Sequence, residues 1–324
     1  MLTRTLGLSN AARRRAHASR AAALALLALL ACGVAGCSGT PGRTGEARSG
    51  GTPPPAVPEY SSIVAAYNAR IAGLARLSSP VSVVIDRRRD EGEGRTRDQL
   101  DGNLSIMPPS STALRLDKAG VNAAYLGSND FAYWWLDLSG SEPVALAGTH
   151  LKASRDDAAD FGLPVHPLEF IELLGVLPLP AEPAVDDAVR WTPDGASLVV
   201  AAPSRWGVRR FLLDPSTLEP RAIELLDDRG TLAVGAALSE FRPAFIEGRP
   251  GVSVRVPTKV ELLIPGDDTR VLLVLASPKV PLKINPRAFQ LSGLIESYGV
   301  RRFVDQDARG ERRRGEGSSR SDAR

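Results

Sequence analysis

Residues 197–226 read SLVVAAPSRWGVRRFLLDPSTLEPRAIELL, and this stretch indicates the fold class. Three short apolar runs, at 197–202, 208–214 and 221–226, are separated by residues that form turns. Apolar residues in such short, turn-bounded runs are typical of β-strands, whose side chains alternate between two faces. Connections this short join antiparallel neighbours. The stretch therefore predicts part of an antiparallel meander.

The same rhythm continues in both directions along the chain. It predicts further strands at 81–85, 100–107, 113–116, 123–126, 131–138, 188–192, 231–241, 254–264 and 270–276. Two stretches, 60–77 and 167–176, have helical spacing instead, and in the first of them Ile63, Tyr67 and Ile71 fall on one stripe. We expect a mainly β chain (α+β) with one helix before the meander and one inserted in it.

The N-terminal 36 residues have the pattern of an export signal. A basic segment precedes the apolar run AAALALLALLA at 21–31, which is too short to cross a bilayer but suits a signal peptide. Val34-Ala35-Gly36-Cys37 follows and resembles the lipobox of bacterial lipoproteins, with Cys32 as a weaker second candidate. We expect residues 1–36 to be removed and Cys37 to carry the lipid that anchors the chain to a membrane.

Composition divides the rest of the chain. Residues 37–58 and 306–324 are rich in small and charged residues, which predicts a disordered tether and a disordered tail around a folded domain at 59–305. The whole chain has 40 basic and 37 acidic residues. Without the five arginines of the signal peptide, 35 basic and 37 acidic residues are left, a formal charge of −2. This balance gives no indication of nucleic acid as a partner.

Four segments, in this order, resemble the LolA/LolB-like superfamily of lipoprotein carriers and receptors. They are GNLSIMPP at 102–109, GSNDFAYWW at 127–135, the mid-chain helix around 168–174, and INPRAFQL at 284–291 as a terminal strand. The resemblance covers about Tyr60 to Leu291. It implies a strongly curved antiparallel sheet forming a half-open barrel, covered by the two helices, with an apolar hollow that receives acyl chains. The lipid anchor makes the chain look more like the receptor than the soluble carrier.

Within that fold, alternating side chains on one strand point to opposite faces of the sheet. Candidate residues for the cavity are Phe131, Tyr133 and Trp135 from the aromatic strand and Ile63, Tyr67 and Ile71 from the first helix. The other face of the aromatic strand, with Trp134, Leu136 and Leu138, is the alternative inward set. Either set can also simply fill a core.

Signals for catalysis or metal binding are weak. The only two histidines after the signal peptide, His150 and His166, lack metal-ligand spacing, and the acidic pairs fall in predicted turns. Neither a nucleophile elbow nor a phosphate-binding loop is found, so we expect no enzyme, no cofactor and no metal. WTPDG at 191–195 resembles a turn of TolB-type propeller blades, but propellers repeat their motif and it occurs once here, so a hairpin turn is the simpler interpretation.

The sequence therefore predicts an exported, lipid-anchored protein of the cell envelope, in the outer membrane facing the periplasm if the cell is Gram-negative. Its domain is expected to bind acyl lipid or lipoproteins. The alternative is an interaction or sensor module with a filled core that binds a protein partner. An open hollow would favour the first hypothesis and a plugged one the second.

Overall fold

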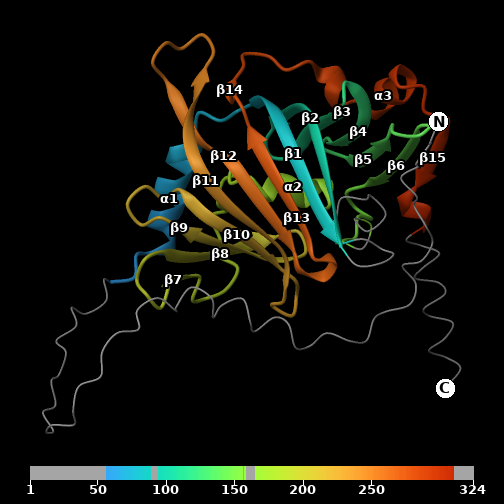
Figure 1. Cartoon of the computed structure of the whole chain (residues 1–324). Helices are drawn as coiled ribbons and strands as arrows, with labels where there is room; N and C mark the ends of the chain where they lie inside the picture. The colour runs from blue at the N-terminus through green and yellow to red at the C-terminus, as the bar shows by residue number, and fades with distance from the viewer. Residues whose placement is uncertain (1–55, 89–93, 156, 158–164, 310–324) are drawn as a thin grey trace, which may run out of the picture. The chain divides into compact units, whose positions relative to one another are not determined.

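The computed structural model describes residues 56–88, 94–155, 157 and 165–309. The described part of the chain starts with helix α1 and continues as a first meander of six strands (Figure 1). Their bounds are α1 Tyr60–Ile71, β1 Leu77–Arg88, β2 Arg95–Met107, β3 Ser111–Lys118, β4 Val121–Ser128, β5 Ala132–Asp137 and β6 Val144–Thr149. The predicted strands of this region are all present. Strand β6 was not predicted, because its sequence VALAGT is rich in alanine and glycine, which disfavour strands.

A second meander follows helix α2, which spans Pro167–Leu173. Its strands are β7 Val189–Trp191, β8 Leu198–Ser204, β9 Gly207–Leu213, β10 Pro220–Leu226, β11 Leu232–Ile246, β12 Ser253–Ile264 and β13 Thr269–Leu275. All seven were predicted, with bounds that differ by a few residues. The WTPDG segment makes the hairpin turn between β7 and β8, which pair antiparallel.

The two meanders join side by side into one curved sheet. The hydrogen-bonded order is β15-β6-β5-β4-β3-β2-β1-β13-β12-β11-β10-β9-β8-β7, where β15 spans Arg302–Asp305. Strand β14, Lys279–Val280, pairs with both β1 and β11. Pairing is antiparallel except for β15 with β6 and β14 with β11. Among the described residues the end strands β15 and β7 do not pair with each other, so the expected half-open sheet is confirmed.

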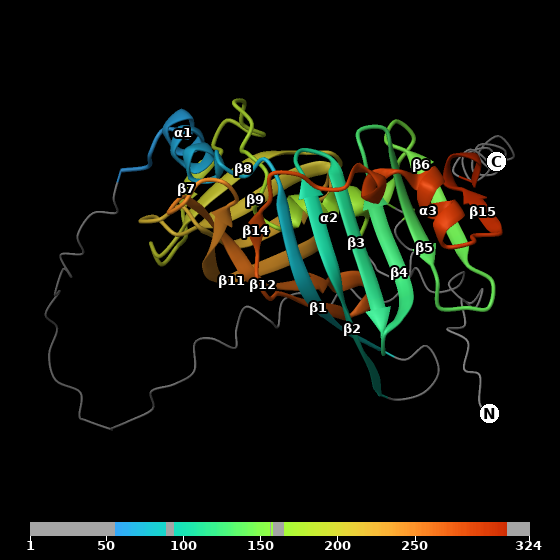
Figure 2. The ribbon, with the colours of Figure 1, turned by 90° about the horizontal axis from the view of Figure 1, so that it is seen from above.

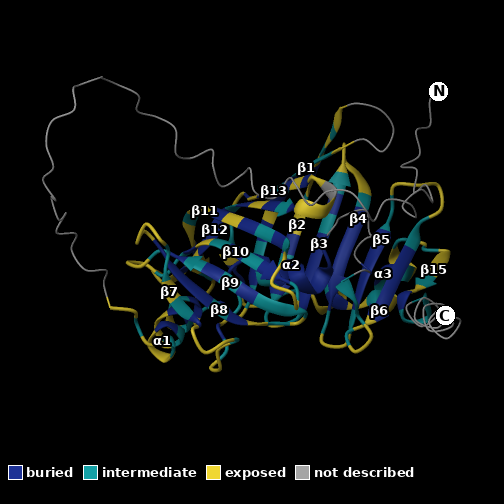
Figure 3. Ribbon diagram, turned by 90° about the horizontal axis from the view of Figure 1, so that it is seen from below, coloured by how far each residue is buried: buried dark blue, intermediate teal, exposed yellow. Residues whose placement is uncertain are grey.

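Helix α2 connects the two ends of this sheet. It follows β6 near one end and precedes β7 at the other, so the chain between them has to cross a face of the sheet. It crosses on the inner, concave face, where α2 packs against β4, β5 and β10 (Figure 3). The helix is shorter than the predicted 167–176 because Gly175 takes a left-handed φ of 66°, a conformation that ends helices.

Helix α1 covers the second meander. Its buried residues Ile63, Tyr67 and Ile71 are those predicted to share a stripe. The ring of Tyr67 packs edge-on against Phe211 of β9, with the ring centroids 5.6 Å apart. The helix ends at Ile71 and not at Leu77, because Leu77 already begins β1 with its side chain buried in the core.

The C-terminal segment lies on the outer face of β3–β6 (Figure 2). The terminal strand predicted at 284–291 is wrong: residues Pro286–Phe289 form a 3₁₀ helix, η3, and Leu291–Ser297 form helix α3. The Asn285 side chain accepts a hydrogen bond from the Arg287 N–H, and Pro286 occupies the first helical position. Both features start a helical turn and not a strand.

The folded part continues a little beyond the predicted boundary at residue 305. Residues 306–309 are helical and Gln306 is buried, while residues 310–324 lie outside the described residues. The predicted signal peptide, Cys37 and most of the predicted tether also lie outside them. None of the helices in the described part is long and apolar enough to span a membrane.

Candidate acyl-binding seam

The largest core of the described residues lies between the concave face of the sheet and helices α1 and α2. Strands contribute alternate residues to it. In β1, for example, Val81, Val83 and Ile85 are buried and share one face. Figure 3 shows how continuous the buried surface of the strands is on this side. We refer to the contact between α2 and the concave face as the seam.

A small cavity remains in the seam, with a volume of about 20 Å³. All its lining residues are apolar: Val83, Leu114, Leu126, Val165, Phe170, Leu262, Val271 and Leu273. A space of this size holds about one water molecule, and an apolar wall offers that water no hydrogen bond. The seam is therefore dry and, in this conformation, has no room for an acyl chain.

Helix α2 and Val165, just before it, fill the space next to this cavity. Phe170 and Val165 come from this part of the chain, and the other six lining residues come from strands of both meanders. His166 starts the helix by accepting a hydrogen bond from the Leu168 N–H, at 3.2 Å. A helix of seven residues has little stability of its own, so α2 depends on what it packs against.

Polar contacts hold α2 in addition to the apolar ones. Arg155 Nε donates to Glu169 Oε1 at 2.7 Å, and the Glu169 side chain is 3% exposed. Burial raises the pKa of Glu169 although Arg155 opposes that shift. One turn further on, the Ser204 hydroxyl donates to Glu172 Oε2 at 2.7 Å. These bonds fix the side of α2 that does not face the cavity.

A third polar contact lies beside His166, the residue that precedes the helix. The Tyr133 hydroxyl donates to Asp157 Oδ2 at 2.9 Å, and burial, followed by the charge of Asp157, raises the Tyr133 pKa. The His166 ring packs between Tyr133 and Trp206, with ring centroids at 4.3 Å and 4.9 Å. Burial, with the charge of Arg205 next, lowers the pKa of His166 to about 3, so its imidazole is neutral at physiological pH.

Five of the six predicted cavity residues are buried in the main core. Ile63, Tyr67, Ile71, Tyr133 and Trp135 belong to it, but none of them lines the residual cavity. Their contact with a ligand stays a prediction. The other face of β5 is buried as well, since Trp134 and Leu136 pack in a second core under η3 and α3.

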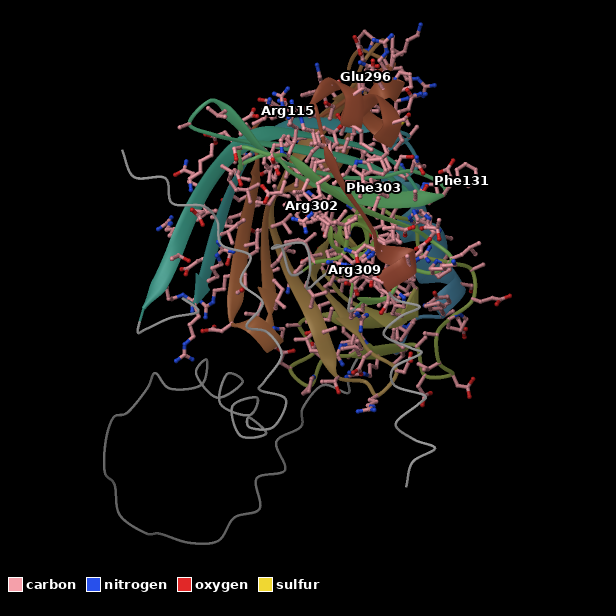
Figure 4. The ribbon with its side chains drawn as sticks, turned by 90° about the vertical axis from the view of Figure 1, so that its right-hand side faces the viewer. Arg115, Phe131, Glu296, Arg302, Phe303 and Arg309 are labelled. Carbon is pink, nitrogen blue, oxygen red and sulfur yellow. The ribbon has the colours of Figure 1, made fainter. Side chains whose placement is uncertain are left out.

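The prediction that Phe131 lines the cavity is wrong. The residue is 79% exposed and lies in the turn before β5, not in the sheet. The Asn129 side chain accepts hydrogen bonds from the N–H groups of Phe131 and Ala132, which closes this turn before the strand alternation begins. Figure 4 shows Phe131 at the surface of the molecule.

The seam also contains residues that the sequence did not single out. Phe170 was within the predicted mid-chain helix, and its apolar side chain in that helix was the available signal. Val165 gave no such signal. Among the described residues, no group of three or more His, Cys, Asp or Glu side chains is arranged to hold a metal ion.

The sequence matches no family model and no curated protein. Three solved structures are similar to the chain at low identity. A domain described as a putative outer membrane lipoprotein-sorting protein of Vibrio parahaemolyticus has a TM-score of 0.47 and 10% identity, over 72% of this chain and 97% of that one. A DUF1329 family protein of Desulfovibrio piger has a TM-score of 0.46 and 12% identity, over 72% and 98%. A LolA superfamily protein of Nitrosomonas europaea has a TM-score of 0.41 and 12% identity, over 71% and 97%.

Apart from the terminal strand at 284–291, the element order found here is the one that the LolA/LolB-like resemblance implied: a helix, a curved and mostly antiparallel sheet, and an inserted helix on its concave side.

Proposed function

We propose that the protein is an envelope lipoprotein, anchored through Cys37, whose seam binds the acyl chains of lipids or lipoproteins. The proposal rests on one observation. Helix α2, a short helix in the connection between the two meanders, covers the continuous apolar concave face of the sheet. Either the side chains of α2 or an acyl chain can shield that apolar face from water. Each methylene group that leaves water for it contributes about 0.8 kcal/mol.

Binding requires movement, because the residual cavity is only about 20 Å³. An acyl chain enters when Phe170 and Val165 withdraw from the strands and the chain takes their place. The ligand then covers the apolar strand surface that α2 has left. The polar contacts of α2, such as Arg155 with Glu169, lie outside the cavity lining and set how firmly the seam is closed.

The test compares two buried phenylalanines on opposite faces of the sheet. Phe170 is 6% exposed in the seam and Phe289 is 5% exposed in the second core. Each change to alanine leaves a void of similar size, with a typical cost of about 3–5 kcal/mol. Uptake of a fluorescent fatty acid is expected to increase in Phe170→Ala and to stay at the wild-type level in Phe289→Ala.

Organic extracts of the purified wild-type protein are the second measurement, and they are expected to contain acyl lipid. Clean extracts together with no fatty-acid uptake by either variant would refute acyl binding.

The small size of the cavity favours a second candidate function, a module with a filled core that binds a protein partner. Its surface carries Phe131, 79% exposed, and Phe303, 54% exposed, which lie on the same side of the molecule (Figure 4). Cross-linking in intact cells, with Phe131→Ser and Phe303→Ser compared with wild type, tests this candidate. It gains support if a specific adduct is lost in the variants while extracts of the protein contain no lipid.

A further inference from the structure

Arg209 is a buried cation on the concave face. It lies in β9 on the same face as Phe211 and Leu213 and is 5% exposed. Its guanidinium carbon is 4.9 Å from the centroid of the Phe211 ring, and Nη2 donates to the Pro178 carbonyl at 3.3 Å. Its Nε is buried and has no hydrogen-bond partner among the described residues.

Arg70 of α1 lies close to the same place. Its guanidinium carbon is 4.7 Å from the centroid of the Tyr67 ring, and Nη2 donates to the Gly175 carbonyl at 3.3 Å. Its Nε is also buried and without a partner in the described part of the chain. The Tyr67 ring packs against Phe211, so the two arginines stack on two rings that contact each other. The positive charges of both arginines act on the Tyr67 hydroxyl and oppose the rise in its pKa that burial causes.

No carboxylate among the described residues pairs with Arg70 or Arg209. Other arginines of the protein do have such partners: Arg155 pairs with Glu169, and Arg210, the neighbour of Arg209, pairs with Glu224. A buried charge without a counter-ion is costly unless it binds an opposite charge. Carbonyl oxygens and ring faces surround the two guanidinium groups instead, and neither Nε donor has a hydrogen-bond partner in the part of the chain that the structure describes.

Two of these carbonyl groups, those of Gly175 and Pro178, belong to the segment that follows α2, while Arg70 Nη1 also donates to the Arg255 carbonyl of β12, at 3.2 Å. Asn68 of α1 holds this segment with two hydrogen bonds to the backbone of Leu179, at 2.9 Å and 2.8 Å. The Tyr67 hydroxyl donates to the Gly175 carbonyl at 3.2 Å. Movement of α2 pulls on this segment directly, because only Leu174 separates the helix from Gly175. Opening of the seam would therefore free the Nη2 donors of Arg70 and Arg209.

We propose that Arg70 and Arg209 bind the anionic group of an acyl ligand, a carboxylate or a phosphate, while its hydrocarbon chain occupies the seam. This inference rests on the function proposed above and assigns the class of ligand. The guanidinium group presents two parallel N–H donors that match a carboxylate or phosphate, and each Nε here is such a donor. The bound anion replaces the carbonyl acceptors of Gly175 and Pro178 and supplies the missing counter-charge.

The experiment compares dodecanoate with dodecanol, which have the same chain length but differ in head-group charge. Each compound displaces a fluorescent fatty acid from the full chain, and inorganic phosphate is a third competitor. We expect dodecanoate to act at about a tenfold lower concentration than dodecanol. In Arg209→Gln and in Arg70→Gln the two compounds should act within about twofold of each other. Arg210→Gln, on the opposite face of β9, is the matched control and should keep the wild-type preference.

Three outcomes would overturn the assignment in distinguishable ways. Equal displacement by both compounds in the wild type, or a preference that survives in both variants, refutes the anion site but leaves acyl binding intact. If inorganic phosphate displaces the fluorescent fatty acid at the concentrations at which dodecanoate does, the two arginines bind free anions and the hydrocarbon chain plays no part in recognition. If neither dodecanoate nor dodecanol displaces the probe, the proposed function fails, and the head-group assignment fails with it. Because the part-exposed Arg70 is tested separately, a folding defect of Arg209→Gln does not decide the result.

Discussion

The imidazole of His166 packs edge-on against the phenol ring of Tyr133, with ring centroids 4.3 Å apart and planes inclined by 60°. This contact connects the start of α2 to β5. It joins the inserted helix to the aromatic strand in a place where neither ring is exposed to solvent. The protonation of His166 is therefore coupled to the docking of α2.

Lowering the pH should destabilise the protein through His166. Its pKa is about 3 in the folded state, against an ordinary value of 6.5, because burial disfavours the charged ring. Between those values the unfolded chain binds more protons, so stability falls as the pH falls through that window. From pH 7 to pH 5 the loss due to His166 is about 2 kcal/mol.

The measurement for this prediction is the free energy of unfolding in urea, at both pH values, for wild type and His166→Gln. The difference between the two proteins removes the contribution of other groups, including Glu169, whose raised pKa acts in the opposite direction. An identical pH dependence in wild type and variant would contradict the prediction.

Removing Arg155 should leave the buried carboxylate of Glu169 without its ion-pair partner. Because the Glu169 side chain is 3% exposed, Arg155→Met leaves its charge without the partner and should cost about 3–5 kcal/mol at pH 7. The double variant Arg155→Met/Glu169→Gln should recover part of that loss, since no charge is then buried. Arg210→Met, which breaks a pair with Glu224 whose side chains are 34% and 25% exposed, is the control and should cost about 1 kcal/mol or less. Equal losses in Arg155→Met and Arg210→Met would show that the burial of Glu169 is unimportant.

A methyl group at Gly102 should not fit between two strands. A Cβ placed there would be 1.8 Å from the backbone carbonyl oxygen of Arg115 in β3, so the strands would have to separate. The midpoint temperature of thermal unfolding is expected to be well below the wild-type value in Gly102→Ala. Gly293→Ala is the contrast, because nothing lies within 4 Å of its Cβ and alanine favours the α3 helix by about 0.5–1 kcal/mol. A Gly102→Ala protein as stable as wild type would mean that β2 and β3 lie further apart.

Membrane attachment should depend on Cys37 and not on Cys32. Thiols that receive a diacylglyceryl group cannot be replaced by a hydroxyl, so Cys37→Ser should leave the protein outside the lipoprotein pathway. Cys32→Ser keeps the predicted lipobox and should fractionate with membranes like the wild type. Mass spectrometry of the N-terminal peptide is the direct readout. A bare Cys37 thiol in the wild-type protein would remove the support for anchoring.

Much of the fold was predictable from local patterns. Short apolar runs between turn residues gave both meanders, and a change to helical spacing gave α1 and α2. The failures have local causes too. Strand β6 lacks β-branched residues apart from its ends, and within residues 284–291 a 3₁₀ helix forms at Pro286–Phe289 because Asn285 and Pro286 start one.

The faces of β5 show the limit of such patterns. Alternation placed Tyr133 and Trp135 on one face and Trp134 and Leu136 on the other, but it left open which face is inward. The structure buries both: the first pair lies in the main core and the second lies under α3. The residues that cover Trp134 and Leu136 are distant in the sequence, so the local pattern of β5 cannot predict that this face is buried.

The sequence by itself determined most strands of the two meanders, the helices α1 and α2 and the order of these elements, because backbone conformation follows from the spacing of apolar residues and from turn chemistry over a few positions. Only the tertiary structure decided that α2 crosses the concave face, that Phe170 fills the seam and that Arg70 and Arg209 meet beside Tyr67. Those contacts depend on how strands β1 and β13 join the two meanders, and pairing between distant segments is fixed by packing of the whole sheet.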